Sequence, residues 1–273
     1  MKTQHKYLFL SLSAIMLLLS SCQDVIDIEL KDGDRVYVIE GGVYEGVDSV
    51  MVHVTKTTSY FDTSEPIGVS DATVVLTMPD NSEVPLTYVA SGYYKASGLN
   101  VIADGTYKLK VTADGKQFTS SSRMPPSVSI DSLEVVPQAG FGPQQGPPKL
   151  NILVSFQDPI GASFYRISAD LNHEPLNGAA DLEVFDDNLN DGTLIRIPYF
   201  ARLFDPGDTV DIYLNSIDEG TFNFWNTFGP IATGDAGSPF SAAPANPVSN
   251  IKGGALGVFG AYTKDHRMII LHP

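Results

Sequence analysis

An acidic turn past the middle of the chain carries the residues best suited to binding a metal ion. The stretch 186–192 reads DDNLNDG, so carboxylate and amide oxygens recur at short intervals. Such oxygens suit calcium, and counting back from Gly192 puts Asp187 and Asp191 at the first and fifth places of an EF-hand-like loop. Leu189 takes the third place and cannot ligate. Asp, Asn and Gly are also the residues of any tight turn, which is the simpler interpretation.

Hydrolytic chemistry needs a nucleophile, a base and a group that orients the base. Neither a G-x-S-x-G nor an H-E-x-x-H motif occurs, and the histidines are scattered at positions 5, 53, 173, 266 and 272. We therefore expect a protein that is not an enzyme, with no catalytic residue and no cofactor. The alternative is a hydrolase acting on glycans or peptides through paired carboxylates of its second domain, since the chain has 32 acidic residues.

The single cysteine of the chain, Cys22, follows an apolar run at residues 8–19. Spanning a membrane as a helix takes about 20 apolar residues, so this shorter run predicts a secretory signal over residues 1–21. The stretch 19–22 (LSSC) resembles the bacterial lipobox, in which the cysteine becomes the first mature residue and carries acyl chains. A disulfide within the chain is excluded because there is no second cysteine.

Charge favours a covalent anchor over an electrostatic one. The net charge is −15, so phosphate backbones repel the chain and nucleic-acid binding is not expected. Anionic lipid surfaces repel it too. Each buried methylene contributes about 0.8 kcal/mol and one acyl chain binds only reversibly, whereas the three chains implied by the lipobox would hold the protein stably. The polar stretch 22–34 would then be the lipidated tether.

The elements that follow predict a β-sandwich over residues 35–124. In the stretch 107–112 (YKLKVT), the residues at 107, 109 and 111 are apolar and those at 108, 110 and 112 are polar. This alternation is typical of a strand with one face exposed to solvent. Asp114-Gly115 fits a tight hairpin turn. Short strands and turn signals repeat through this region, and two prolines after Met124 end the pattern.

Residues 125–273 predict a second sandwich of the same kind. A Gly, Pro and Gln segment at 137–149 indicates an exposed loop, and the alternation in 209–217 indicates a strand. Residues 220–229 form the one plausible helix, with Phe222, Trp225 and Phe228 on a core-facing stripe. The chain closes with what we interpret as a pair of strands. The fold class is thus all-β: two consecutive antiparallel β-sandwich (immunoglobulin-like) domains, with one short helix in the second.

The closing segment 246–262, NPVSNIKGGALGVFGAY, resembles the final motif of a lipoprotein family of Bacteroidota called domain of unknown function 4249. Its glycines permit positive φ and close backbone approach, and Asn250 suits holding a turn. A phosphate-binding loop is not favoured, because no helix follows and Lys252 precedes the glycines. Further pieces of the family pattern occur in the expected order: CQDVIDIEL, EGGVY, DATVVLT, DGTYKLKV and FDDNLNDG.

The resemblance implies an outer-membrane lipoprotein, often encoded beside TonB-dependent transporters. Gln23 and Asp24 after Cys22 also resemble the acidic surface-export signal of such lipoproteins, which predicts a chain facing the cell exterior. We therefore expect a non-catalytic accessory binding component of a TonB-dependent transport system, held at the outer membrane by its lipid. A structural or adhesive envelope lipoprotein is a further alternative.

Overall fold

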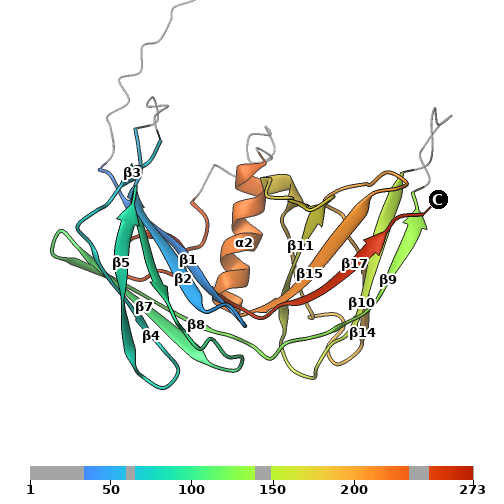
Figure 1. Ribbon diagram of the computed structural model, residues 1–273, viewed down its shortest axis with the longest axis horizontal. Coiled ribbons are helices and arrows are strands. Elements are labelled where there is room, and N and C mark those ends of the chain that lie inside the picture. Colours follow the sequence, from blue (N-terminus) through green and yellow to red (C-terminus); the bar gives the residue numbers. More distant parts are fainter. Residues whose placement is uncertain (1–33, 60–64, 139–148, 234–245, 273) are drawn as a thin grey trace, which may run out of the picture. The chain divides into compact units, whose positions relative to one another are not determined.

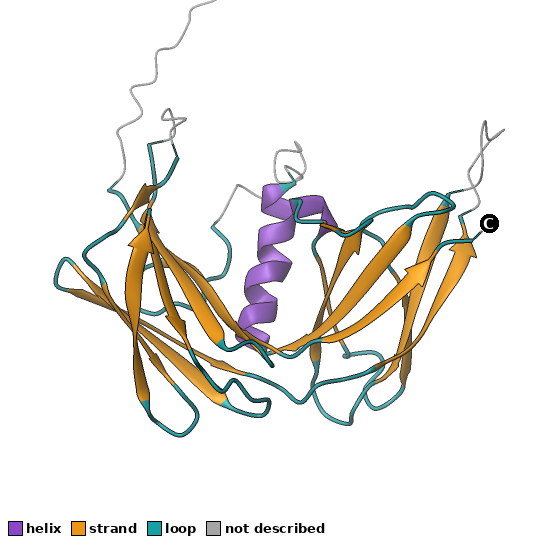
Figure 2. Ribbon diagram, in the orientation of Figure 1, coloured by secondary structure: helices purple, strands orange, loops and turns teal. Residues whose placement is uncertain are grey.

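The computed structural model describes residues 34–59, 65–138, 149–233 and 246–272. These residues form mainly β-strands, with one long helix (Figure 1 and Figure 2). The predicted all-β sandwich class is therefore confirmed. Cys22, nearly all of the tether and most of the 137–149 loop lie outside the described residues. Within the described part of the chain, no helix combines the length and apolarity that crossing a membrane would require.

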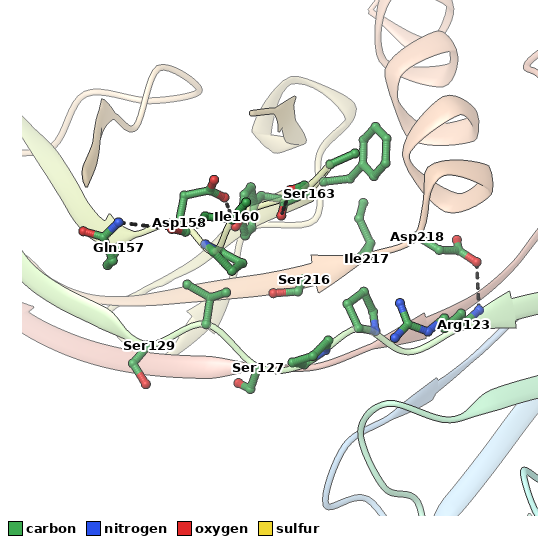
Figure 3. A pocket seen from close by; sticks show the side chains of 18 of the residues that line it. Arg123, Ser127, Ser129, Gln157, Asp158, Ile160, Ser163, Ser216, Ile217 and Asp218 are labelled. Carbon is green, nitrogen blue, oxygen red and sulfur yellow. Dashed lines mark hydrogen bonds between the residues drawn. The ribbon is translucent and has the colours of Figure 1, made fainter. Parts of the chain in front are cut away.

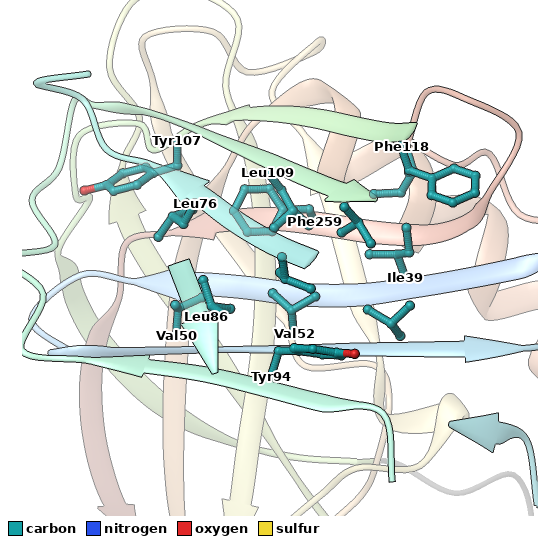
Figure 4. Close-up of a cluster of buried hydrophobic side chains, with 14 of the residues drawn as sticks. Ile39, Val50, Val52, Leu76, Leu86, Tyr94, Tyr107, Leu109, Phe118 and Phe259 are labelled. Atoms are coloured by element: carbon teal, nitrogen blue, oxygen red, sulfur yellow. The ribbon is translucent and has the colours of Figure 1, made fainter. Parts of the chain in front are cut away.

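The first sandwich is one nine-stranded sheet whose order is β16-β1-β2-β6-β5-β4-β7-β8, with β3 beside β2. Strand β5 pairs with both β6 and β4, so it joins the two layers. Figure 4 shows the apolar side chains of the layers meeting, including Ile39, Val52 and Leu109. The strands are β1 (Tyr37–Tyr44), β2 (Ser49–Lys56), β3 (Ile67–Gly68), β4 (Thr73–Thr77), β5 (Glu83–Ala90), β6 (Tyr93–Ser97), β7 (Thr106–Ala113) and β8 (Lys116–Arg123).

The alternation predicted for residues 107–112 is present in β7. Tyr107, Leu109 and Val111 are buried, and the residues between them are not. The β7–β8 hairpin turns at Asp114 and Gly115, both at positive φ (48° and 72°). Positive φ at two successive turn residues matches the twist of the flanking strands, which is why Asp-Gly was a sound hairpin signal.

The second sandwich packs a three-stranded sheet, β14-β10-β9, against the sheet β12-β11-β15-β17, with β13 also paired to β11. Tyr165 and Ile167 of β11 enter its core, so Phe164 and Arg166 point to the opposite face. The elements are β9 (Ile130–Pro137), β10 (Leu150–Gln157), β11 (Phe164–Leu171), β12 (Glu174–Pro175), η1 (Ala179–Asp181), β13 (Glu183–Asp186), β14 (Leu194–Pro198), β15 (Thr209–Ile217) and β17 (Asp265–Ile270).

The predicted helix is confirmed as α2 (Glu219–Ala232). Its N-cap is Asp218, whose carboxylate accepts the Thr221 N–H at 2.9 Å. Phe222 is buried, and its ring centroid lies 5.0 Å from that of Phe164 on β11. Trp225 and Phe228 are only half-buried, so the expected stripe is fully buried at Phe222 alone. The helix contacts β16, β11 and β13, which ties it to both sandwiches.

The two closing strands are both present, but they join different sheets. Strand β16 (Leu256–Tyr262) lies parallel to β1, in register from Val38 opposite Leu256 to Tyr44 opposite Tyr262. Strand β17 instead pairs with β15. The expected second domain, 125–273, therefore loses this segment to the first sheet, which is not purely antiparallel. Parallel strands need a long crossover, and here β2 to β15 and α2 all lie between β1 and β16.

Side chains of the closing motif explain why β16 fits beside β1. Phe259 is fully buried in the first core. Gly257 has φ 102°, and a β-carbon there would lie 2.1 Å from the Ile39 carbonyl oxygen. The Asn250 amide donates to the Phe259 carbonyl at 2.8 Å and accepts its N–H at 3.0 Å, so it replaces a missing strand neighbour. Gly257 therefore permits the close approach of the β16 backbone to β1, and Asn250 supplies hydrogen-bond partners for the backbone of Phe259.

Two glycine substitutions separate conformational strain from close approach. Gly254 also has positive φ (89°), but no atom lies within 4 Å of its β-carbon position. Gly254→Ala should destabilise the protein by about 1–2 kcal/mol through backbone strain alone. Gly257→Ala should destabilise by about 3 kcal/mol or more, because β1 must also move away. Urea unfolding of the two variants measures the difference, and equal losses would contradict the close approach.

Candidate functional site

Two loops of the second sandwich bring three carboxylates together. Asp187 and Asp191, predicted from the acidic turn, meet Asp158, which follows β10. One oxygen of each carboxylate lies within 4.8 Å of the others. Asp158 could not be predicted from the sequence, because only the pairing of the strands that flank these loops brings it to the turn.

Each of these carboxylates already accepts a hydrogen bond from the facing loop. Asp158 accepts from the Tyr165 hydroxyl and from the Gly192 N–H at 2.9 Å. Asp187 accepts the Ser163 N–H at 2.9 Å. Burial, reinforced by the bond to Asp158, raises the pKa of Tyr165 well above its usual range. These contacts hold the two loops against each other.

Asp191 completes the cluster from its exposed edge. Its carboxylate accepts the Gly161 N–H at 2.7 Å, and unlike Asp158 and Asp187 it is exposed to solvent. Calcium takes six to eight oxygen ligands, so carbonyl or water oxygens would have to add to the three carboxylates. These hydrogen bonds account for the geometry of the turn without a metal ion, and calcium at Asp187 and Asp191 stays a prediction.

A pocket of about 730 Å³ adjoins this cluster (Figure 3). Its walls come from the connection 123–131 after β8, the loop and strand start at 157–165, and residues 216–219 where β15 leads into α2. The size is that of a small-molecule site. Its apolar lining comprises Pro125, Pro126, Val128, Ile160, Phe164 and Ile217.

The polar groups of the pocket differ in their availability. Asp218 caps α2 and also accepts the Arg123 N–H at 2.9 Å, so its carboxylate is engaged. The Ser216 hydroxyl is buried and has no hydrogen-bond partner. A ligand in this pocket would meet apolar walls together with polar side chains, among them Arg123, Asp131 and Gln157.

The described histidines lie away from the pocket lining. The ring of His53 stacks on Tyr93 at 3.9 Å in the first sandwich. His266 lies 2.7 Å from an oxygen of Asp211, on the pair of strands β15 and β17. Among the residues that line the pocket, the Tyr165 hydroxyl donates to Asp158, and no histidine, cysteine or lysine accompanies them.

One half-buried carboxyl outside the pocket, that of Glu183, has a strongly altered pKa. Burial raises the pKa of Glu183 on β13 to about 7, although the Phe200 N–H donates to its carboxylate at 3.1 Å and lowers it. Sequence reasoning did not single out Glu183, because only the tertiary packing removes it from water.

Comparison with known proteins gives one family and 75 chains of solved structures, including the following two. The family described as domain of unknown function (DUF4249) matches residues 23–267. A two-domain fibronectin type III segment of chicken tenascin is 14% identical, with 67% of this chain and 91% of that chain covered and a TM-score of 0.23. The native conformation of E. coli alpha-2-macroglobulin is 10% identical, with 71% and 14% covered and a TM-score of 0.24. No curated protein matches the chain.

The calcium hypothesis predicts a gain in thermal stability. Calcium should raise the melting temperature relative to EDTA, because a ligand that binds only the folded state stabilises it. Asp191→Asn should abolish the rise. Asp186→Asn is the matched control, since Asp186 bonds to Asn188 within the same turn and stands outside the cluster. A melting temperature indifferent to calcium would leave the carboxylates as hydrogen-bond acceptors only.

Glu183 should make stability depend on pH. Between its ordinary pKa of 4.5 and its folded pKa of about 7, the folded protein holds a proton that the unfolded chain has lost. The stabilisation that Glu183 contributes is therefore complete below pH 4.5 and is lost as the pH rises through about 7. Glu183→Gln should melt higher than the parent above pH 7 and lose that advantage at acidic pH. Glu83→Gln, at an exposed position, should show no such trend.

Proposed function

Because the chain belongs to the family called domain of unknown function 4249, we propose that it is a non-catalytic lipoprotein of the outer membrane. Its role is to bind a ligand or partner as an accessory component of a TonB-dependent transport system. The observation that carries a binding role is the pocket of about 730 Å³, with its apolar walls and its unpartnered Ser216 hydroxyl.

The anchor rests on Cys22 and its surroundings. The family match starts at residue 23, directly after the cysteine that the lipobox makes the first mature residue. Three acyl chains on Cys22 would hold the protein at the bilayer, and the net charge of −15 leaves no electrostatic route to an anionic surface. The acidic residues after Cys22 support a chain that faces the cell exterior.

Binding fits the chemistry of the pocket better than hydrolysis does. Asp158 and Asp218 border the pocket, and each accepts a backbone N–H as well as a second donor. A carboxylate held in this way has a fixed position and a stabilised charge, which suits a structural acceptor. The apolar walls would supply the affinity for a ligand, and polar lining residues such as Arg123 and Asp131 would orient it.

Replacing Cys22 by serine tests the anchor. Cys22→Ser keeps the size of the side chain but cannot carry the acyl group, so the protein should leave the outer-membrane fraction and keep its signal uncut. Ser21→Ala is the matched control, because it retains a small residue before the cysteine and should remain membrane-bound. Fractionation with immunoblotting measures both. Retention of the serine variant in the envelope would contradict the lipid anchor.

The partner is tested in the same membranes. A pull-down of the tagged, lipidated protein from detergent-solubilised outer membranes should recover a TonB-dependent transporter. Protease treatment of intact cells should remove the chain if it faces outward. Recovery of the protein alone would count against the transport role while leaving the anchor untouched.

A further inference from the structure

Arg166 has no anionic partner, although the chain has 32 acidic residues. It lies on the face of β11 opposite the core and is half-buried. Its Nε atom is buried, and no atom accepts a hydrogen bond from the Nε–H. Arg196 and Arg202, by contrast, pair with Glu134 and Asp181. Within the part of the chain that the structure describes, Arg166 forms no ion pair.

Aromatic side chains surround the guanidinium. Its central carbon lies 4.7 Å from the ring centroid of Trp225 on α2. The Trp225 indole N–H donates to the Tyr262 hydroxyl at 3.1 Å, and Tyr44 stacks on Tyr262 at 4.8 Å between ring centroids. Burial raises the pKa of both phenols while the charge of Arg166 lowers it, in keeping with a guanidinium close to them.

No described residue of the neighbouring strands accepts a hydrogen bond from the Arg166 side chain. Across the pairing with β13 stands Val184, and across the pairing with β15 stands Asn215. The Asn215 amide nitrogen donates to the Thr263 carbonyl at 3.0 Å, and its oxygen makes no bond to the guanidinium. A cation–π contact with Trp225 attracts the charge but accepts none of the guanidinium N–H groups in its plane. A buried guanidinium N–H that no group accepts costs free energy, so the unpaired Nε of Arg166 points to an external partner for the guanidinium.

We propose that Arg166, walled by Trp225 and Tyr44, binds the carboxylate of a small organic acid with an apolar body. The planar guanidinium fork matches the two oxygens of a carboxylate. A doubly charged phosphate is less suited, because the net charge of −15 opposes it more strongly. Tyr44 is 38% exposed, so one wall of the site faces solvent and gives the acid a route in. The site is separate from the pocket beside Asp158 and does not depend on the lipid anchor.

The only tryptophan of the chain is Trp225, so its fluorescence reports on this site directly. Titration of the whole folded protein with cyclohexanecarboxylate, which is transparent where tryptophan absorbs, should give a saturable change. The neutral isostere cyclohexanecarboxamide should give none. Arg166→Met should weaken carboxylate binding by at least about tenfold, and Arg166→Lys should weaken it less because it keeps the charge without the fork.

Arg196→Met is the matched control, since Arg196 is already paired with Glu134 on the other sheet and its loss should leave the titration unchanged. Arg166→Met should also keep or raise the melting temperature, as expected for a charge that the fold does not need. An equal response to the amide, no saturable response to the acid, or saturation by inorganic phosphate instead would each overturn the proposal. So would a marked fall in the melting temperature of Arg166→Met.

Discussion

The parallel pairing of β16 with β1 is the constraint on which the rest of the structure depends. It brings Phe259 into the first core and sets Tyr262 beside Tyr44. Because α2 packs on β16, the same pairing decides where the helix stands and therefore where Trp225 meets Arg166. The contact of Tyr44 with Tyr262 and that of Arg166 with Trp225 therefore both depend on one strand, β16, which returns to the sheet that contains β1.

A second set of contacts, made of hydrogen bonds, fixes the start of α2. The carboxylate of Asp218 caps α2 and accepts the N–H of Arg123 at the end of β8. Next to it, the Ser122 hydroxyl accepts the Ala261 N–H at 2.9 Å. The last residues of the first sandwich are therefore bonded to both α2 and β16. The connection that follows them forms one wall of the pocket, so that wall is held at its origin by hydrogen bonds.

Local patterns in the sequence predicted local structure well. The alternation around Leu109, the Asp114-Gly115 hairpin and the helix after Asp218 all follow from propensities that act within a few residues. The pairing of β16 could not be predicted in this way, because an apolar strand carries no mark of its partner or direction. For the same reason the acidic turn could be identified, whereas Asp158 could not.

The environment of individual side chains could not be predicted from the sequence either. Arg166 and Glu183 look like ordinary charged residues of strands, and only packing shows that one lacks a partner and the other is removed from water. The Trp225 stripe was interpreted as core because its spacing fits a buried helix face. Its actual contacts are with a guanidinium and a tyrosine hydroxyl, so the helix presents a chemically mixed face.

The late position of β16 also bears on the order in which the chain can fold as it is synthesised. A nascent chain released up to Arg123 has eight of the nine strands of the first sheet, yet β1 still has an unpaired edge and its core lacks Phe259. That edge is a template for wrong pairing until β16 has emerged, which happens only after β9 to β15 and α2 have been made. Closure of the first sheet therefore comes when translation is nearly complete. The second sandwich is completed later still, because its strand β17 follows β16 in the sequence.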